Sequence, residues 1–188
     1  MGIIILTGTP GTGKTTIARL LSKKINALLI EIKKIVEKNK TVFPKKGKEQ
    51  IVDIKKLQKL VLDEIKNKPT SPVIIEGHLA AELKIPALLG IVLRCQPKIL
   101  EKRLQKRNYS KQKIKENILA ELLDYCTQVA HTNFKGKTRI VEIETGNKKA
   151  SSVAREIIMI IKNKRRTKEI SYKKELMEFL GLSHARSK

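Results

Sequence analysis

The sequence predicts an α/β fold, with helices layered on a parallel sheet, in a chain of 188 residues. Short runs of Ile, Val and Leu alternate with stretches whose apolar residues recur at helical spacing. The first of these runs, at residues 3–6, leads directly into a glycine-rich loop and then into a helical pattern. The length suits one domain with a sizeable core, and a second full domain is not expected.

The N-terminal part is expected to hold a strand, the glycine loop, a helix and an exposed segment. Residues 3–6 are branched and aliphatic, which is typical of a central parallel strand buried on both faces. Helical spacing of apolar residues then predicts a helix over residues 13–24. Residues 27–32 favour a short strand that runs into a small helix. Lys, Pro and Gly in residues 38–50 indicate an exposed segment, and we expect a substrate flap at about residues 30–51.

The middle of the chain is expected to add one helix and two strands. Asp53 is placed to cap a helix over the apolar positions that follow it. Residues 72–75 form the next predicted strand, which ends at Glu76. A further apolar run at residues 88–93 predicts a strand that is followed by Arg94.

Two more helices and a short lid are expected next. Pro97 stands where the first turn of a helix accepts proline. Asn108 then occupies the left-handed cap position, within a short lid at about residues 106–116. Ser110 can cap a new helix that is expected to run to about Ala130.

The core is expected to close with a strand at residues 139–143 and a helix at residues 149–161. The composition then changes, because residues 162–188 hold nine Lys or Arg against three Glu. We therefore place the domain at residues 1–162 and a basic C-terminal tail at residues 163–188.

The net charge is unusually high. The chain has 41 Lys and Arg against 18 Asp and Glu, which gives +23 and directs the molecule toward polyanions. A Lys-rich surface can also follow from genome composition or heat adaptation, although heat adaptation usually raises Glu together with Lys. With three Tyr, three Phe and no Trp, base stacking is not expected, so any contact with RNA should be to phosphates.

The remaining composition indicates a protein of the cell interior. Cys95 and Cys126 lie far apart without the spacing of a metal site, so neither a metal cluster nor a disulfide framework is expected. No apolar run reaches the length of a membrane span, and the N-terminus lacks the basic region of a signal peptide. We expect a cytoplasmic monomer without a membrane partner.

Residues 8–15, GTPGTGKT, match the P-loop pattern, in which backbone amides and a helix N-terminus surround phosphate oxygens. Lys14 is expected to reach the β- and γ-phosphates, the Thr15 hydroxyl to bind Mg²⁺, and Thr16 to touch the α-phosphate. Three glycines allow backbone conformations that side chains would obstruct, namely Gly8, Gly11 and Gly13. A chance glycine turn would not require the preceding strand. The pattern predicts a site for ATP with Mg²⁺.

Glu76 and His78 follow a strand that should lie beside the first one. An acid at this place can hold Mg²⁺ directly or through water, and we expect Glu76 to do so. A lone acid at a strand end can also serve only as a helix cap. His78 either orients a water for hydrolysis or satisfies a hydrogen bond of the loop.

Three arginines are candidates for contact with the transferred phosphate. Arg103 and Arg107 are four residues apart on a predicted helix, so they should project from one face and converge on one polyphosphate. Arg94 is expected to enter from the neighbouring strand end. Phosphoryl transfer needs positioning and charge neutralisation more than acid–base chemistry. The alternative is that these arginines belong to a generally basic surface. The candidate catalytic residues are Lys14, Glu76, His78, Arg94, Arg103 and Arg107.

The motifs GTPGTGKTT, VIIEGH, VLRC and LEKRLQKRNYS occur in this order between residues 3 and 160. Together they resemble the adenylate kinase isoenzyme six family, small kinase-like proteins of archaea and eukaryotes associated with small-subunit ribosome assembly. The resemblance implies a three-layer P-loop fold of the nucleoside-monophosphate-kinase type with a five-stranded parallel sheet. It also implies ATP:AMP phosphotransfer, slow ATPase activity and a ribosomal protein or rRNA (16S or 18S) as partner. In that family the counterpart of Arg107 contacts ATP, and the counterparts of Glu76 and His78 are tied to hydrolysis.

The sequence departs from the family pattern in the segment expected to bind the monophosphate. No arginine occurs between Arg19 and Arg94, and Glu37 stands near the place where related kinases have a basic residue. Asn108 replaces the usual glycine, which the left-handed cap should tolerate. The cations available as substitutes, without a bidentate fork, are Lys33, Lys34 and Lys38.

Two functions therefore remain open from the sequence. The first is an adenylate kinase that closes around ATP and AMP. The second is an ATPase switch that releases a ribosomal protein and has little monophosphate kinase activity. A non-catalytic RNA-binding protein is hard to reconcile with the intact pair of Lys14 and Thr15.

Overall fold

A five-stranded parallel sheet forms the centre of the protein. The computed structural model describes residues 2–46, 49–67, 72–134, 138–163 and 169–182. The strands lie in the order β2-β5-β1-β6-β7, and each neighbouring pair is parallel. Their bounds are β1 Ile3–Gly8, β2 Leu28–Glu31, β5 Val73–Glu76, β6 Leu89–Arg94 and β7 Arg139–Glu144. The predicted α/β fold with this sheet is confirmed.

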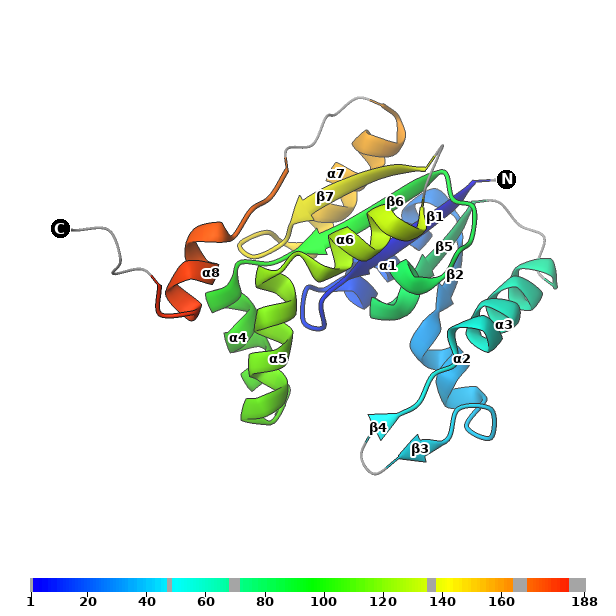
Figure 1. Ribbon diagram of the computed structural model, residues 1–188. Coiled ribbons are helices and arrows are strands. Elements are labelled where there is room, and N and C mark those ends of the chain that lie inside the picture. Colours follow the sequence, from blue (N-terminus) through cyan, green and yellow to red (C-terminus); the bar gives the residue numbers. More distant parts are fainter. Residues whose placement is uncertain (1, 47–48, 68–71, 135–137, 164–168, 183–188) are drawn as a thin grey trace.

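Helices cover both faces of the sheet, which makes three layers (Figure 1). Side chains alternate along β1, so Ile4 and Leu6 join one core cluster while Ile5 joins the other. The first cluster packs against α1 Lys14–Ile25 and α7 Ala150–Ile161. The second packs against α3 Ile54–Lys66 and α6 Tyr125–Asn133. No helix in the described part of the chain is both long and apolar enough to cross a membrane.

The chain between β2 and β5 includes the segment expected to be a flap. There α2 (Ile32–Lys38) follows β2 directly, and β3 (Lys45–Lys46) pairs antiparallel with β4 (Glu49–Gln50). The Asp53 carboxylate accepts hydrogen bonds from two backbone N–H groups in the first turn of α3, at 2.9 and 3.1 Å. The predicted cap is therefore confirmed, and the function of the flap stays a prediction.

The helix that follows β6 has both of its predicted ends. In α4 (Pro97–Gln105) proline occupies the first turn. Asn108 adopts φ 57° in the turn that follows this helix. Asparagine tolerates this left-handed conformation better than most residues do, which explains why it can replace glycine here.

The segment expected to be one helix as far as Ala130 is in fact two helices. Ser110 caps α5 (Lys111–Leu122), because its hydroxyl oxygen accepts a hydrogen bond from a backbone N–H at 3.3 Å. Asp124 then has φ 54°, which ends α5 and lets α6 start in a new direction. The single-helix prediction is wrong, because the positive φ of Asp124 interrupts the helix. The carboxylate of Asp124 pairs with Arg94 at this bend.

The C-terminal segment packs onto α4 and α5 instead of extending from the domain as a separate tail. Tyr172 is 5% exposed and belongs to a core cluster with apolar residues of both helices. Ile170 packs against the same cluster, and α8 (Lys173–Phe179) follows. The boundary expected at residue 162 is corrected, because the domain core continues past it. Two parts of the expected tail lie outside the described residues, namely 164–168 and 183–188.

Candidate active site

The loop between β1 and α1 has the backbone conformation that its glycines permit. Gly8 and Gly11 have φ values of 137° and 95°, which other residues rarely adopt. A Cβ atom on Gly8 would lie 2.3 Å from the carbonyl oxygen of Leu93, and one on Gly11 would lie 2.7 Å from Leu100 Cδ1. Gly13, with φ 96°, immediately precedes α1. The loop therefore lies against the C-terminal end of β6 and against α4, with the start of α1 at its end.

Lys14 lies buried beneath this loop. Its ammonium donates hydrogen bonds to the carbonyl oxygens of Gly8, at 2.7 Å, and Thr9, at 3.0 Å. Burial lowers the pKa of Lys14 to about 8. A phosphate oxygen would replace lost solvation and favour the charged form, because an opposite charge stabilises a buried cation.

Thr15 and Glu76 join the start of α1 to the end of β5. The Thr15 hydroxyl donates a hydrogen bond to Glu76 Oε1 at 3.1 Å. Glu76 is 3% exposed, and this burial raises its pKa, while the Thr15 hydroxyl and the Lys14 ammonium act in the opposite direction. One hydroxyl and one carboxylate are a suitable partial donor set for Mg²⁺, which prefers oxygen ligands and takes the rest from phosphates and water. Among the described residues no group of three His, Cys, Asp or Glu offers an all-protein metal cage.

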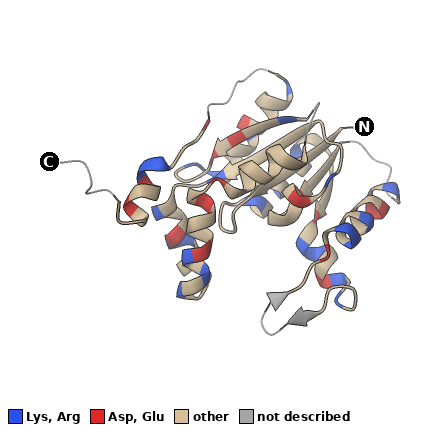
Figure 2. Cartoon of the chain, viewed as in Figure 1, with Lys and Arg blue, Asp and Glu red and all other residues tan. Residues whose placement is uncertain are grey.

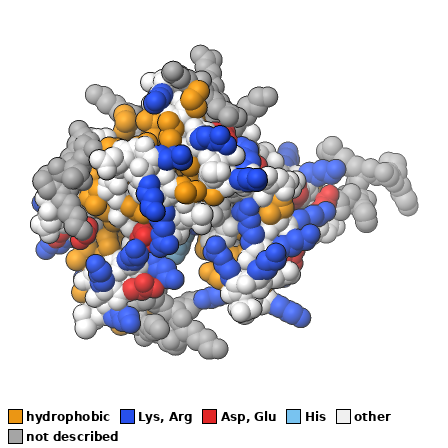
Figure 3. Space-filling view, turned by 180° about the vertical axis from the view of Figure 1, so that it is seen from behind, with side chains coloured by type: hydrophobic (Ala, Val, Ile, Leu, Met, Phe, Trp, Pro, Cys, Tyr) orange, Lys and Arg blue, Asp and Glu red, His pale blue; other side chains and the backbone are white. Residues whose placement is uncertain are grey.

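A cleft of about 650 Å³ opens beside the loop. Its walls come from the loop, from one side of α2, from residues 77–79 and from the turn that joins α4 to α5. On the face shown in Figure 3, Lys and Arg side chains gather on both sides of a hollow. The cationic side chains that line the cleft are Lys14, Lys33, Arg107 and Lys113. The sequence indicated the first three and missed Lys113, which only the fold of α5 brings to the cleft.

A smaller cavity of about 400 Å³ lies on the other side of the loop. It is lined by the start of α1, the end of α4, the turn after β7 and the start of α7. Thr16 and Arg107 border both cavities. A ligand with a base in the small cavity could therefore direct its phosphates past the loop into the cleft.

Arg107 is exposed in the turn after α4, at the junction of the two cavities. This place is compatible with a contact between Arg107 and ATP, which stays a prediction. Arg103 instead donates hydrogen bonds to three backbone carbonyls, those of Thr145 at 2.9 Å, Gly146 at 2.8 Å and Gly11 at 3.4 Å. The expected convergence of Arg103 and Arg107 is corrected, because the Arg103 guanidinium is occupied by the protein. It supports the loop instead of lying free for a polyphosphate.

Arg94 does not point into either cavity. It is 2% exposed and forms ion pairs with Glu121 at 2.9 Å and Glu142 at 2.5 Å, and with Asp124. The expectation that Arg94 contacts the transferred phosphate is therefore corrected. Three acidic partners that were not recognisable from sequence spacing hold it inside the domain.

His78 opens the short 3₁₀ helix η1 (His78–Glu82) and lines the cleft. Burial against the surrounding protein lowers the pKa of His78 to about 4, with the Lys14 ammonium as a second cause, while part of the residue stays exposed in the cleft. The imidazole is therefore neutral near pH 7 and can both donate and accept hydrogen bonds. The backbone oxygen of His78 accepts a hydrogen bond from the Thr7 hydroxyl at 3.3 Å, but this bond does not involve the imidazole, whose role stays a prediction.

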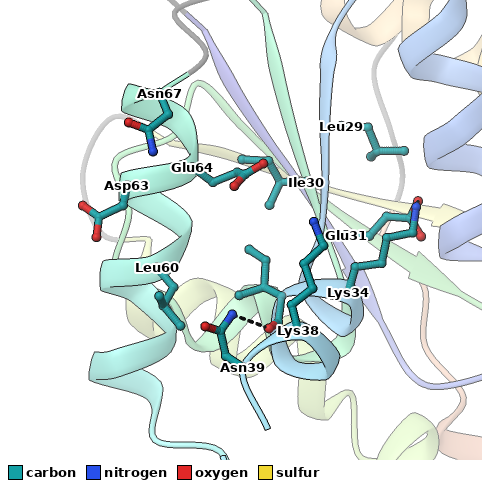
Figure 4. Close-up of a pocket in the computed structure, with 11 residues that line it drawn as sticks. Leu29, Ile30, Glu31, Lys34, Lys38, Asn39, Leu60, Asp63, Glu64 and Asn67 are labelled. Atoms are coloured by element: carbon teal, nitrogen blue, oxygen red, sulfur yellow. Dashed lines mark hydrogen bonds and ion pairs between the residues drawn. The ribbon is translucent and has the colours of Figure 1, made fainter. Parts of the chain in front are cut away.

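The three lysines of α2 separate onto two sides of that helix. Lys33 lines the cleft, where it lies 3.6 Å from Glu37. Lys34 and Lys38 line a different cavity of about 430 Å³ between α2, α3 and the edge strand β2 (Figure 4). In that cavity Lys34 pairs with Glu31 at 2.8 Å. Of the lysines suggested for the monophosphate, the structure brings only Lys33 to the cleft.

Sequence reasoning also missed Glu121. It is 2% exposed and accepts a hydrogen bond from the Thr9 hydroxyl in the loop. The available signal was its place among Ile118 and Leu122 on the buried side of α5, because an acid on the apolar side of a helix needs a specific partner.

Solved structures share this architecture. Shikimate kinase from Acinetobacter baumannii in complex with shikimate has a TM-score of 0.62 at 20% identity, covering 88% of this chain and 96% of that chain. A gluconokinase from Sinorhizobium meliloti has a TM-score of 0.52 at 13% identity, covering 86% and 94%. The likeness shows that the five-stranded sheet, the loop after β1 and the surrounding helices form an α/β fold of the P-loop type.

The family follows from comparison of sequences. A family model described as "AAA domain" matches residues 4–124. A protein named "Putative adenylate kinase" from Methanocaldococcus jannaschii is 37% identical over 170 residues, 89% of this chain and 90% of that protein. A protein of the same name from Pyrococcus furiosus is 36% identical over 185 residues, 96% and 98% of the two chains. The chain therefore belongs to this AAA-domain family of P-loop proteins and shares it with these archaeal relatives.

Proposed function

We propose that this protein transfers the terminal phosphoryl group of ATP to AMP and forms two molecules of ADP. The observation that carries the proposal is the pair of cavities that meet at Thr16 and Arg107. The smaller cavity suits the nucleoside of ATP, and the larger cleft has room for its phosphates and for a second nucleotide. The name of the archaeal relatives supports this choice among kinase reactions.

We propose a separate role in this transfer for each residue at the loop. Lys14 would neutralise charge on the moving phosphoryl group, and Arg107 would do so from the opposite wall of the cleft. Thr15 and Glu76 would hold Mg²⁺. An ion held there would supply charge neutralisation at the phosphates. The loop amides would orient the phosphates at the start of α1.

We expect the acceptor to meet lysines in the cleft, since Lys14 and Arg107 would serve the phosphates of ATP. Lys33 and Lys113 line the cleft as point charges, and Glu37 lies next to Lys33. Ammonium groups lack the bidentate fork of arginine, so the monophosphate would be held with less geometric control. Water could then compete as acceptor, and we propose slow ATPase activity with His78 as the group that orients it.

A measurement of ADP production decides between acceptors. The protein is incubated with ATP and Mg²⁺ alone, and then with AMP, other nucleoside monophosphates, shikimate or gluconate. Production that rises most with AMP supports the proposal. A rate that is the same with and without every acceptor contradicts phosphotransfer and leaves only hydrolysis.

The charge distribution favours a second candidate function, an ATPase switch in maturation of the small ribosomal subunit. Lys and Arg are spread over α3, α4, α5 and α8, well beyond the nucleotide site (Figure 2). Residues 98–115 alone carry eight basic residues against Glu101. We propose rRNA, or a small-subunit protein seated on it, as the partner. Hydrolysis stimulated by small subunits, in the absence of AMP, would support this function over the first.

A further inference from the structure

Glu121 connects the phosphate loop with the interior of the domain. Its carboxylate accepts a hydrogen bond from the Thr9 hydroxyl, one from Arg94 Nε at 2.9 Å and one from the backbone N–H of Cys95 at 3.0 Å. Glu121 and Arg94 are each 2% exposed. A buried carboxylate needs such partners, because a buried charge is costly unless it is paired and hydrogen-bonded.

The C-terminal segment holds the other end of this connection. Arg94 donates a hydrogen bond to the carbonyl oxygen of Ile170 at 3.3 Å. Its guanidinium also lies 5.0 Å from the centre of the Tyr172 ring, in a cation–π contact. Glu142 accepts hydrogen bonds both from Arg94, at 2.5 Å, and from the backbone N–H of Ile170, at 2.8 Å. The segment therefore contacts Arg94 at Nη1 and through the Tyr172 ring, whereas Glu121 contacts Nε and Nη2.

Tyr172 reaches the loop through a second series of contacts. Its hydroxyl donates a hydrogen bond to Glu144, which also accepts one from the backbone N–H of Gly146 at 2.7 Å. Burial and the neighbouring carboxylate raise the pKa of Tyr172, so the hydroxyl stays protonated as a donor. The carbonyl of Gly146 in turn accepts a hydrogen bond from Arg103, which also contacts the carbonyl of Gly11.

We propose that the C-terminal segment around Tyr172 is a positioning element of the nucleotide site, which acts on Thr9 through Arg94 and Glu121. The Thr9 carbonyl already accepts hydrogen bonds from the Lys14 ammonium and from the backbone N–H of Thr12, at 3.2 Å. A change in the backbone conformation of Thr9 would therefore disturb both the Lys14 ammonium and the loop amides that we expect to surround phosphate. This inference concerns ATP binding and holds whichever acceptor takes the phosphoryl group.

The first experiment replaces the hydroxyl that contacts Glu121. Thr9→Val keeps the shape of the side chain and removes the donor, whereas Thr9→Ser keeps the donor. The dissociation constant for ATP with Mg²⁺ is measured by calorimetry on the full chain. We expect Thr9→Val to weaken ATP binding about tenfold, because it removes a hydrogen bond to a buried charge, and Thr9→Ser to bind like the wild type. Equal affinity for all three proteins would overturn the proposal.

The second experiment tests the transmission from the C-terminal segment. Tyr172→Phe keeps the ring over Arg94 and removes only the bond to Glu144, whereas Tyr172→Leu removes the ring as well. We expect Tyr172→Leu to bind ATP about threefold more weakly than Tyr172→Phe, because only the leucine variant loses the cation–π contact with Arg94. In the Thr9→Val background this difference should vanish, because the link from Glu121 to the loop is already broken. A difference that persists unchanged in that background would refute transmission through Glu121.

A purely structural role for these residues would give another result. Ile160 is 1% exposed in α7 and belongs to a separate core cluster, so Ile160→Ala supplies a matched loss of stability. Thermal unfolding of all variants is followed, and binding is measured at a temperature where each is folded. We expect Ile160→Ala to lower Tm and leave ATP affinity unchanged. If it weakens ATP binding as much as Thr9→Val does, the effect is general destabilisation and the proposal fails.

Discussion

The Thr15 hydroxyl donates a hydrogen bond to Glu76 Oε1 across 3.1 Å and so joins two parts of the chain that lie 61 residues apart. The parallel pairing of β1 with β5 causes this meeting, because the carboxyl ends of parallel strands lie at one edge of the sheet. Glu76 is buried and Thr15 is partly buried, and the Lys14 ammonium lies close enough to act on the pKa of the Glu76 carboxyl.

Replacement of Glu76 should stabilise the folded protein and weaken its use of Mg²⁺. Burial raises the pKa of the Glu76 carboxyl above its ordinary value of 4.5, so folding favours the protonated form. The resulting destabilisation is absent below that ordinary pKa and grows as the pH rises through the folded value. We expect Glu76→Gln to raise Tm at pH 7 but not near pH 4, and to raise the Mg²⁺ concentration needed for half-maximal turnover. An unchanged Mg²⁺ requirement would remove Glu76 from the metal site.

Lys14→Ala should abolish ATP turnover while the domain remains folded. The lysine acts on charge that develops during transfer, so we expect a loss of about three orders of magnitude in kcat. Lys24→Ala, on the exposed side of the same helix, is the matched control and should retain wild-type activity. Activity of Lys14→Ala at the wild-type level would show that the phosphate loop is not the catalytic site.

Arg107→Ala should lower turnover about a hundredfold, because one positioned donor at a developing charge commonly contributes that much. Arg107 is exposed and borders both cavities, so its removal should leave Tm unchanged. Arg155→Ala, at an exposed position of α7, serves as the control for removal of positive charge. If both variants slow turnover equally, Arg107 acts only through the general field of the protein.

His78→Asn should depress ATP hydrolysis more than phosphotransfer to AMP, since only hydrolysis needs an ordered water. The two rates are measured separately in the same preparation. With a pKa of about 4, His78 is neutral between pH 6 and 8, so its titration should add no step to the pH profile in that range. Equal losses in both reactions would contradict this division.

Binding to rRNA should fall steeply with salt, because each neutralised phosphate releases counterions. Replacement of the exposed Lys98, Lys102 and Lys115 by alanine should weaken binding and make the slope of log affinity against log salt shallower. The change in slope should be about 0.7–0.9 for each phosphate that the variant no longer neutralises. ATP turnover should be unaffected, since none of these side chains lines the cleft. Deletion from residue 163 is not a clean test, because it removes the buried Tyr172. Salt-insensitive binding by the unaltered protein would contradict an electrostatic interaction.

Local features of this protein were predictable from the sequence for a simple physical reason. The strand, the glycine loop and the first helix are contiguous, so one short segment contains both the apolar spacing and the glycines that predict them. The caps at Asp53, Ser110 and Asn108 likewise act within three residues of the chain. These features were sufficient to predict an α/β P-loop domain and the place of its phosphate site.

Tertiary structure decided which charged side chains face that site. Arg94 and Arg107 were both candidates for contact with the transferred phosphate, yet Arg94 is buried by Glu121 and Glu142, which are 27 and 48 residues away. The burial of a charge depends on such distant partners, and no local sequence pattern predicts them. For the same reason only the fold placed Lys33 in the cleft and made Tyr172 part of the core. The sequence alone predicted the loop at which we expect phosphate to bind, and the packing of distant segments determined which side chains line the cavities beside that loop.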